Sequence, residues 1–157
     1  MKHRSISILF LLLSIVINAQ SKKGFESVPG TNRLQVQRNV MIPAKDGIGL
    51  ATDIYRMEGS PSPLPVVLQR TPYGKMSDRF KAVISHLASR GYIVAIQDLR
   101  GRYDSEGIFS KYSPKEAADG AATVEWLAKQ KCCNGKVGMW GTSYGAHTQA
   151  DASKLNP

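Results

Sequence analysis

The sequence predicts an α/β fold, in which an antiparallel hairpin is followed by parallel strands with crossover helices. Apolar residues first alternate with polar ones, as in half-buried strands, and then occur in short continuous runs separated by helical spacings. In addition, 42% of the 157 residues are hydrophobic and 21% are charged, which suits one apolar core and argues against disorder or coiled coil. The strand–helix–strand order calls for right-handed crossovers and helices on both faces of a sheet.

The first residues have the pattern of a secretory signal peptide. Lys2 and Arg4 precede an apolar run over residues 6–17, which is too short to span a bilayer comfortably, and the small residue Ala19 follows. We expect cleavage after Ala19, export to the periplasm or the extracellular space, and no stable membrane insertion of the mature chain. The alternative is an uncleaved membrane anchor.

The charge of the chain does not indicate a nucleic-acid partner. Lys and Arg total 21 against 12 for Asp and Glu, a formal charge of +9. Removal of Lys2 and Arg4 with the signal peptide leaves 19 basic residues against 12, or +7. These charges are spread singly and in pairs, without the basic stripe and interleaved aromatics of a nucleic-acid interface. We therefore expect no nucleic-acid partner.

Two alternating segments predict the hairpin. Residues 20–33 are polar and are expected to form a flexible leader. In the first segment Leu34, Val36, Val40 and Ile42 fall on one parity, which is typical of a strand with one buried face. The second segment repeats the alternation with Ile48, Leu50, Thr52 and Ile54. Pro43 and Gly47 lie between the two segments and suit a turn, so the strands should pair antiparallel.

Continuous apolar runs then predict strands that are covered on both faces. These runs are residues 65–69 and 92–96. Between them, residues 77–90 carry apolar side chains at helical spacing, and Gly91 supplies a stop. This part of the chain is therefore expected to form a strand, a crossover helix and a second parallel strand.

A second crossover helix is expected to begin near Ser113. Ser113 at the N-cap, Pro114 at the first helical position and Glu116 at the third would satisfy free amides reciprocally, as in a capping box. The expected apolar face consists of Ala117, Ala121, Val124, Leu127 and Ala128. We expect residues 134–135 to end this element and residues 136–140 to form the next strand.

That strand runs into the sequence GTSYG at residues 141–145, which matches GxSxG. Between a buried strand and a helix, this pattern is typical of a nucleophile elbow. Side chains at Gly141 and Gly145 would collide where strand and helix approach each other. Ser143 would sit on a tight, strained corner with its hydroxyl exposed. The alternative is an ordinary serine in a glycine-rich turn.

Four stretches resemble the family of cocaine esterases and X-prolyl dipeptidyl-peptidases, whose relatives include α-amino-acid ester hydrolases and glutaryl-cephalosporin acylases. They are DGIGLATDIY at 46–55, RTPYGK at 70–75, RGYIVAIQDLRGRYDSEGIF at 90–109 and NGKVGMWGTSYG at 134–145. The resemblance covers residues 40–145. It implies an α/β-hydrolase fold and a serine hydrolase that cleaves ester or amide bonds through an acyl-enzyme.

The resemblance also implies roles for individual residues. Ser143 would be the nucleophile, and the backbone amide of Tyr144 would be one oxyanion-hole donor. The second donor would be the phenol of Tyr73, which follows the predicted strand 65–69. A turn aromatic beside Pro72 is the alternative for Tyr73.

The triad acid and base are not predicted within this chain. Asp98, Arg100 and Arg102 also match the family and are interpreted as scaffold, with Asp98 and Arg100 pairing or bracing neighbouring loops. Asp98 precedes the serine, whereas the acid follows it in this fold. After the serine only His147 and Asp151 have the right chemistry, but in reversed order, and the His147 ring should project along its helix. Residues 34–157 are thus expected to be the N-terminal portion of a catalytic domain, inactive or nearly so by themselves.

No cofactor or metal site is predicted. None of the three histidines has a Cys or His partner three to five residues away. Cys132 and Cys133 are adjacent, so a disulfide between them would be strained, and the pairing of each stays open.

The expected substrates are small-molecule esters or amides, including short peptides. The oligomeric state stays open. Two alternatives to an enzyme of this kind remain. One is a non-catalytic exported module of hydrolase fold. The other is a nucleotide or flavin binder, although neither GxGxxG nor GxxxxGKS follows the first parallel strand.

Overall fold

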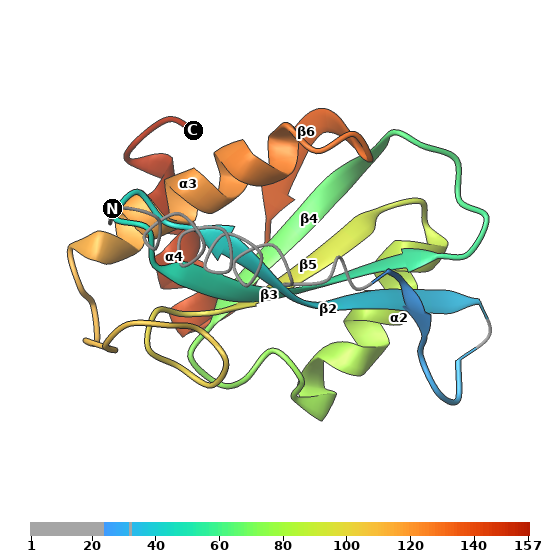
Figure 1. Ribbon diagram of the computed structural model, residues 1–157, viewed down its shortest axis with the longest axis horizontal. Helices are drawn as coiled ribbons and strands as arrows, with labels where there is room; N and C mark the ends of the chain where they lie inside the picture. The colour runs from blue at the N-terminus through green and yellow to red at the C-terminus, as the bar shows by residue number, and fades with distance from the viewer. Residues whose placement is uncertain (1–23, 32) are drawn as a thin grey trace, which may run out of the picture.

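A mixed six-stranded sheet forms the centre of the molecule (Figure 1). The computed structural model describes residues 24–31 and 33–157, and the strand order is β1-β2-β3-β5-β4-β6. β4 lies parallel to β5 and β6, whereas the pairs β1/β2, β2/β3 and β3/β5 are antiparallel. The elements are β1 (Glu26–Ser27), β2 (Leu34–Pro43), β3 (Gly49–Met57), β4 (Leu64–Thr71), the 3-10 turn η1 (Asp78–Phe80), α2 (Lys81–Ser89), β5 (Ile93–Asp98), α3 (Lys115–Ala128), β6 (Cys133–Met139) and α4 (Tyr144–Ser153).

Helices cover both faces of the sheet, which confirms the predicted α/β class. Val94 and Ala95, neighbours on β5, belong to different apolar clusters, as the alternation of strand side chains requires. Ile84 of α2 packs in the first cluster and Leu127 of α3 in the second. The predicted crossover helices therefore pack on opposite faces.

The predicted hairpin is confirmed, with one correction about its second strand. β2 and β3 pair from Leu34 opposite Met57 to Pro43 opposite Gly49, with an irregularity between Gln37 and Val40. The sequence predicted one buried face for the second strand, but the first seven residues of β3 are all buried. The reason is that β3 lies inside the sheet, between β2 and β5, and is covered from both sides.

Two segment boundaries differ from expectation. Part of the expected leader, residues 20–33, is paired: Glu26 lies opposite Val36 of β2, forming the short strand β1. The helix expected over residues 77–90 starts as the 3-10 turn η1 and becomes α-helical at Lys81. The predicted signal peptide, residues 1–19, lies outside the described residues. Within the described part of the chain, no helix has the length and apolar character needed to cross a membrane.

The end of α3 also corrects the prediction. The helix stops at Ala128, and β6 already begins at Cys133, so residues 134–135 lie within a strand instead of ending a helix. Pairing with the neighbouring strand accounts for this extension, because Leu64 of β4 lies opposite Cys133. The register then shifts before Val66 pairs with Val137.

The capping box predicted at the start of α3 is only half formed. The Ser113 hydroxyl accepts a hydrogen bond from the Lys115 amide at 3.2 Å. The Glu116 carboxylate does not return to Ser113; it is buried and accepts a hydrogen bond from the Tyr144 phenol. The buried face of α3 is accordingly more polar than the apolar stripe that was expected, since Asp119 and Thr123 are buried as well.

Candidate active site

Ser143 occupies a sharp corner between β6 and α4. Its backbone angles are φ 54° and ψ −122°, a region that a residue other than glycine rarely adopts. The Ser143 carbonyl accepts hydrogen bonds from the Ala146 amide at 3.0 Å and the His147 amide at 3.2 Å, which begin the helix. The residue itself is exposed. Strand, strained serine and helix thus follow one another as a nucleophile elbow requires.

The two glycines of the corner are not equivalent. Gly141 has φ 142°, and a Cβ atom there would lie 3.1 Å from the Cα atom of Gly145. A Cβ atom on Gly145 would lie 3.4 Å from the Gln69 side chain and 3.9 Å from the Arg70 carbonyl oxygen, which are ordinary contacts. The expected close approach therefore holds at Gly141, whereas the expected collision at Gly145 is wrong.

The side chain of Tyr144 anchors the first turn of α4. Its hydroxyl donates to Glu116 Oε1 at 2.5 Å and accepts from the Tyr112 amide at 2.9 Å. Its ring stacks on that of Tyr112, with centroids 5.1 Å apart. Burial, together with the hydrogen bond to Glu116, raises the pKa of Tyr144 to about 12. Only the backbone amide of Tyr144 was predicted to have a role, because Glu116 lies 28 positions away and no local pattern links the two side chains.

Tyr73 lies on the loop that follows β4. Since β4 and β6 are adjacent and parallel, the loops after them leave the same edge of the sheet, so Tyr73 and Ser143 are on the same side of the molecule. The Tyr73 side chain is 43% exposed and lines a cavity of about 400 Å³. The Arg79 guanidinium lies over its ring, 4.9 Å from the centroid. Among the described residues no hydrogen bond engages the Tyr73 phenol, so it is available to a substrate.

The loop that carries Tyr73 is fixed by buried ionic groups. Lys75 is buried and makes ion pairs with Asp98 at 3.3 Å and with Asp104. Asp98 also accepts from the Lys75 amide at 2.7 Å. Burial raises the pKa of Asp98, and the Lys75 ammonium opposes that rise. The neighbouring Arg102 donates to the Pro72 carbonyl at 3.0 Å. Asp98 and Arg102 therefore act as scaffold, as expected.

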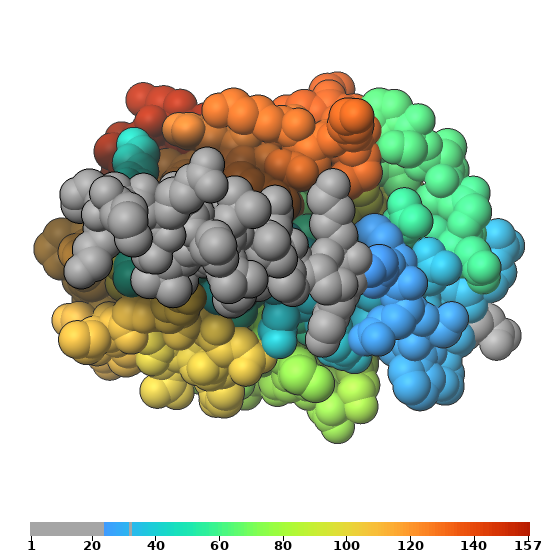
Figure 2. Space-filling view, viewed as in Figure 1, coloured from blue at the N-terminus to red at the C-terminus, as the bar shows by residue number. Residues whose placement is uncertain are grey.

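Asp98 and Arg100 were expected either to pair with each other or to brace neighbouring loops, and the structure shows the second arrangement. Arg100 pairs with Asp119 of α3 at 2.6 Å and with Asp46 at 2.9 Å. These contacts raise the pKa of Arg100 above its ordinary value and lower that of Asp46 to about 2. Arg100 thereby ties the connection between β5 and α3, residues 99–114, to α3 and to the turn between β2 and β3. This connection is the yellow to gold part of the surface at the lower left of Figure 2.

His147 faces carboxylates. Its Nε2 atom lies 3.0 Å from Asp151 Oδ2 and 3.8 Å from Glu116 Oε2. The ring also meets Tyr112 and Tyr144 edge-on. Within the described part of the chain no hydrogen bond joins an imidazole to the Ser143 hydroxyl. Neither carboxylate was predicted as a neighbour of His147 from Cys and His spacing, because Glu116 is 31 positions away in the sequence and Asp151 is neither Cys nor His.

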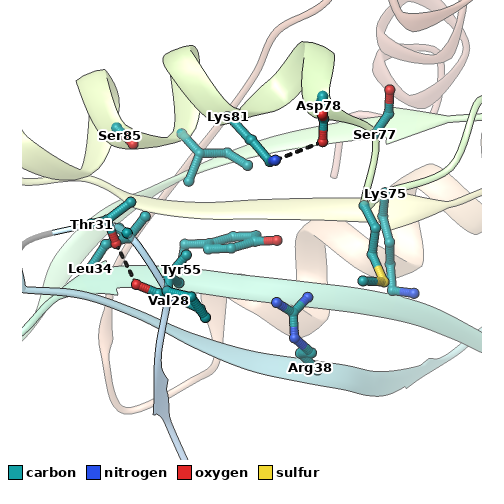
Figure 3. A pocket seen from close by; sticks show the side chains of 14 residues that line it. Val28, Thr31, Leu34, Arg38, Tyr55, Lys75, Ser77, Asp78, Lys81 and Ser85 are labelled. Carbon is teal, nitrogen blue, oxygen red and sulfur yellow. Dashed lines mark hydrogen bonds and ion pairs between the residues drawn. The ribbon is translucent and has the colours of Figure 1, made fainter.

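A separate cavity of about 590 Å³ lies beside the N-terminal segment (Figure 3). Residues 28–31, β2, β3 and α2 surround it, and Arg38, Tyr55 and Lys81 are among its lining side chains. Neither Ser143 nor Tyr73 lines this cavity. Lys75, Met76 and Ser77 line both this cavity and the one beside Tyr73.

Known proteins show the same sequence features and fold. Residues 46–157 match the X-Pro dipeptidyl-peptidase (S15) family. Cocaine esterase from Rhodococcus sp. (strain MB1 Bresler) is 41% identical over 122 residues, which are 75% of this chain and 21% of that protein. A putative serine esterase from Mycobacterium bovis is 29% identical over 124 residues, 66% of this chain and 20% of that protein. The chain thus spans about a fifth of the length of these curated relatives.

Solved structures agree with these matches. A CocE/NonD family hydrolase from Staphylococcus aureus superposes with a TM-score of 0.75 and 28% identity, covering 88% of this chain and 29% of that one. An α-amino acid ester hydrolase superposes with a TM-score of 0.66 and 32% identity, covering 85% of this chain and 25% of that one. The described sheet is therefore part of a hydrolase fold.

Replacing Tyr144 by phenylalanine tests its anchoring role. The change Tyr144→Phe leaves the buried Glu116 carboxylate and the Tyr112 amide without their shared partner. We expect the free energy of unfolding to fall by about 1–3 kcal/mol in denaturant titrations. Tyr112→Phe is the matched control, because Tyr112 is exposed and should change stability by less than about 0.5 kcal/mol. Equal losses in the two variants would contradict the anchor.

The same variants have a second readout at alkaline pH. The Tyr144 phenol has a pKa near its ordinary 10.0 in the unfolded chain and about 12 in the folded one. Between these values the unfolded chain loses a proton that the folded chain keeps, so the free energy of unfolding falls as the pH rises. Tyr144→Phe should reduce this fall, and buried Tyr55, whose pKa is also about 12, accounts for a remainder.

Proposed function

The chain belongs to the X-Pro dipeptidyl-peptidase (S15) family, and we propose that the complete protein is an exported serine hydrolase that cleaves ester or amide bonds through an acyl-enzyme. The observation that carries this proposal is the strained corner at Ser143, which exposes a hydroxyl between a parallel strand and a helix. The relatives named above are an esterase and a putative serine esterase. Small esters or amides, including short peptides, are therefore the proposed substrates.

In the proposed reaction, the Ser143 hydroxyl attacks the carbonyl carbon and a general base takes its proton. The Tyr144 amide, at the positive end of α4, and the exposed Tyr73 phenol donate hydrogen bonds to the oxyanion. Collapse of the tetrahedral intermediate releases the alcohol or amine and leaves an acyl group on Ser143, which water then removes. The hydrogen bonds of the Tyr144 side chain would hold that amide in place.

We assign the triad acid and base to sequence beyond these 157 residues. His147 and Asp151 come in the wrong order for this fold, and the imidazole of His147 faces two carboxylates. Without a base, a serine hydroxyl is a weak nucleophile. The 157-residue chain by itself should therefore be inactive or nearly so.

Active-site labelling tests the nucleophile. A fluorophosphonate probe should modify the complete protein, and Ser143→Ala should abolish the labelling. Ser153→Ala, an exposed serine on the same helix, is the control and should label normally. If the intact protein is not labelled, the protein is a non-catalytic module of hydrolase fold and the proposal is wrong.

Steady-state kinetics test the second oxyanion donor. Tyr73→Phe removes only a hydroxyl, so kcat with an activated ester should fall about a hundredfold or more while KM changes little. Tyr92→Phe is the control, because Tyr92 precedes β5 and so lies at the end of the parallel strands away from Tyr73. Equal turnover in Tyr73→Phe and the unmodified enzyme would leave Tyr73 as a turn residue.

Export is proposed from the first residues of the sequence. A short basic start, an apolar run over residues 6–17 and Ala19 support cleavage after Ala19. Sequencing of the mature N-terminus from a secreting host should begin at Gln20. An intact Met1 in the membrane fraction would indicate an uncleaved anchor.

A further inference from the structure

Three ligand-type atoms converge beneath the elbow. They are Glu116 Oε2 of α3, and His147 Nε2 and Asp151 Oδ2 of α4, all within 4.8 Å of one another. Nothing in the proposed acyl transfer uses this cluster. His147 is nevertheless close in the chain to the nucleophile, since its amide donates to the Ser143 carbonyl.

The outer oxygens of both carboxylates are already engaged. Glu116 Oε1 accepts from the Tyr144 phenol at 2.5 Å, and Asp151 Oδ1 pairs with Lys154 Nζ at 2.5 Å. Such outer partners orient ligating carboxylates in metal sites. They leave Glu116 Oε2 and Asp151 Oδ2 turned toward the same imidazole.

Two of the converging atoms are buried without a hydrogen-bond partner. The Glu116 side chain is 6% exposed, and its Oε2 atom has no partner. His147 Nε2 is also without one, although Asp151 Oδ2 is only 3.0 Å away. The approach of His147 Nε2 to Asp151 Oδ2 is therefore a close contact between charged or polar groups and not a hydrogen bond. A buried carboxylate oxygen without a partner is costly, so a positive charge between the three atoms would be favourable.

We propose that Glu116, His147 and Asp151 bind a divalent transition-metal ion of the Zn²⁺ type. One imidazole nitrogen and two carboxylate oxygens are a donor set that suits zinc, whereas magnesium and calcium prefer oxygen alone. In a tetrahedral zinc site, ligand atoms lie about 3.4 Å apart. The observed separations of 3.0 Å and 3.8 Å from Nε2 bracket that distance.

The ion would join the start of α3 to the first two turns of α4. Glu116 also holds Tyr144, the residue after the nucleophile, so a metal bound here would make the corner at Ser143 more rigid. Its role would be structural. The site stands on its own geometry and does not depend on the proposed hydrolase chemistry.

Metal binding to the complete protein tests the site. The background variant carries Cys132→Ser and Cys133→Ser, so that thiolates do not contribute. After chelator treatment and dialysis against Zn²⁺, it should retain bound zinc and show a higher thermal midpoint than the metal-free protein. With Co²⁺ as a probe, visible absorption bands without thiolate charge transfer should appear.

Near-isosteric variants identify the ligands. Glu116→Gln, His147→Gln and Asp151→Asn should each lose one bound ion, weaken affinity more than about tenfold and remove the zinc-dependent rise in the thermal midpoint. Each variant should keep the far-ultraviolet circular dichroism of a folded protein. His86→Gln, an exposed histidine on α2, is the matched control and should bind normally.

Two outcomes would overturn the proposal. One is zinc bound equally well by His147→Gln, which would place the ion elsewhere. The other is no zinc retained by the background variant, which would show that the three side chains do not form a metal site. Labelling of Ser143 by the fluorophosphonate probe is measured separately, so a failure of the metal site leaves the proposed function standing.

Discussion

The hydrogen bond between the Tyr144 phenol and the buried Glu116 carboxylate positions most of the candidate site. It joins α4, which begins directly after Ser143, to the start of α3. The Tyr112 amide donates a second hydrogen bond to the Tyr144 phenol, so the segment between β5 and α3 is held at the same hydroxyl group. The two helices also pack closely, because a Cβ atom on Gly120 of α3 would lie 2.8 Å from the Cβ atom of Ala152 of α4.

A polar layer lies between this join and the sheet. Arg70 of β4 is fully buried, and it donates to the Gln97 side chain at 2.8 Å and to the Glu116 carbonyl at 2.9 Å. Gln97 in turn receives a hydrogen bond from Thr123 of α3. Most of these buried polar atoms have partners, which stabilises the layer, although Arg70 Nη2 has none among the described residues. The layer therefore fixes α3 over the carboxyl ends of β4 and β5, where the functional loops begin.

Periodicity and turn chemistry were enough to predict the hairpin, the parallel strands and the corner at Ser143, because these depend on neighbours in the chain. These local patterns did not predict side-chain contacts between residues that are far apart in the sequence. Glu116 has the local pattern of a capping residue, yet its carboxylate binds Tyr144. The sequence left open whether Arg100 pairs with Asp98 or braces neighbouring loops, and the structure shows it bound to Asp119 and Asp46. The grouping of Glu116 with His147 likewise requires the packing of α3 on α4, which spacing alone does not encode.

The buried ammonium of Lys75 has a consequence for mutational studies of this family. It neutralises acidic groups from three separate segments, lying 3.9 Å from Asp53 as well as near Asp98 and Asp104. Removing it would leave like charges facing one another in a dry interior and push apart the segments that bear them. Since Tyr73 is two residues away, a substitution at Lys75 would displace the loop that carries the proposed oxyanion donor. A loss of activity in a genetic screen would then reflect a displaced loop and not the loss of a reacting group.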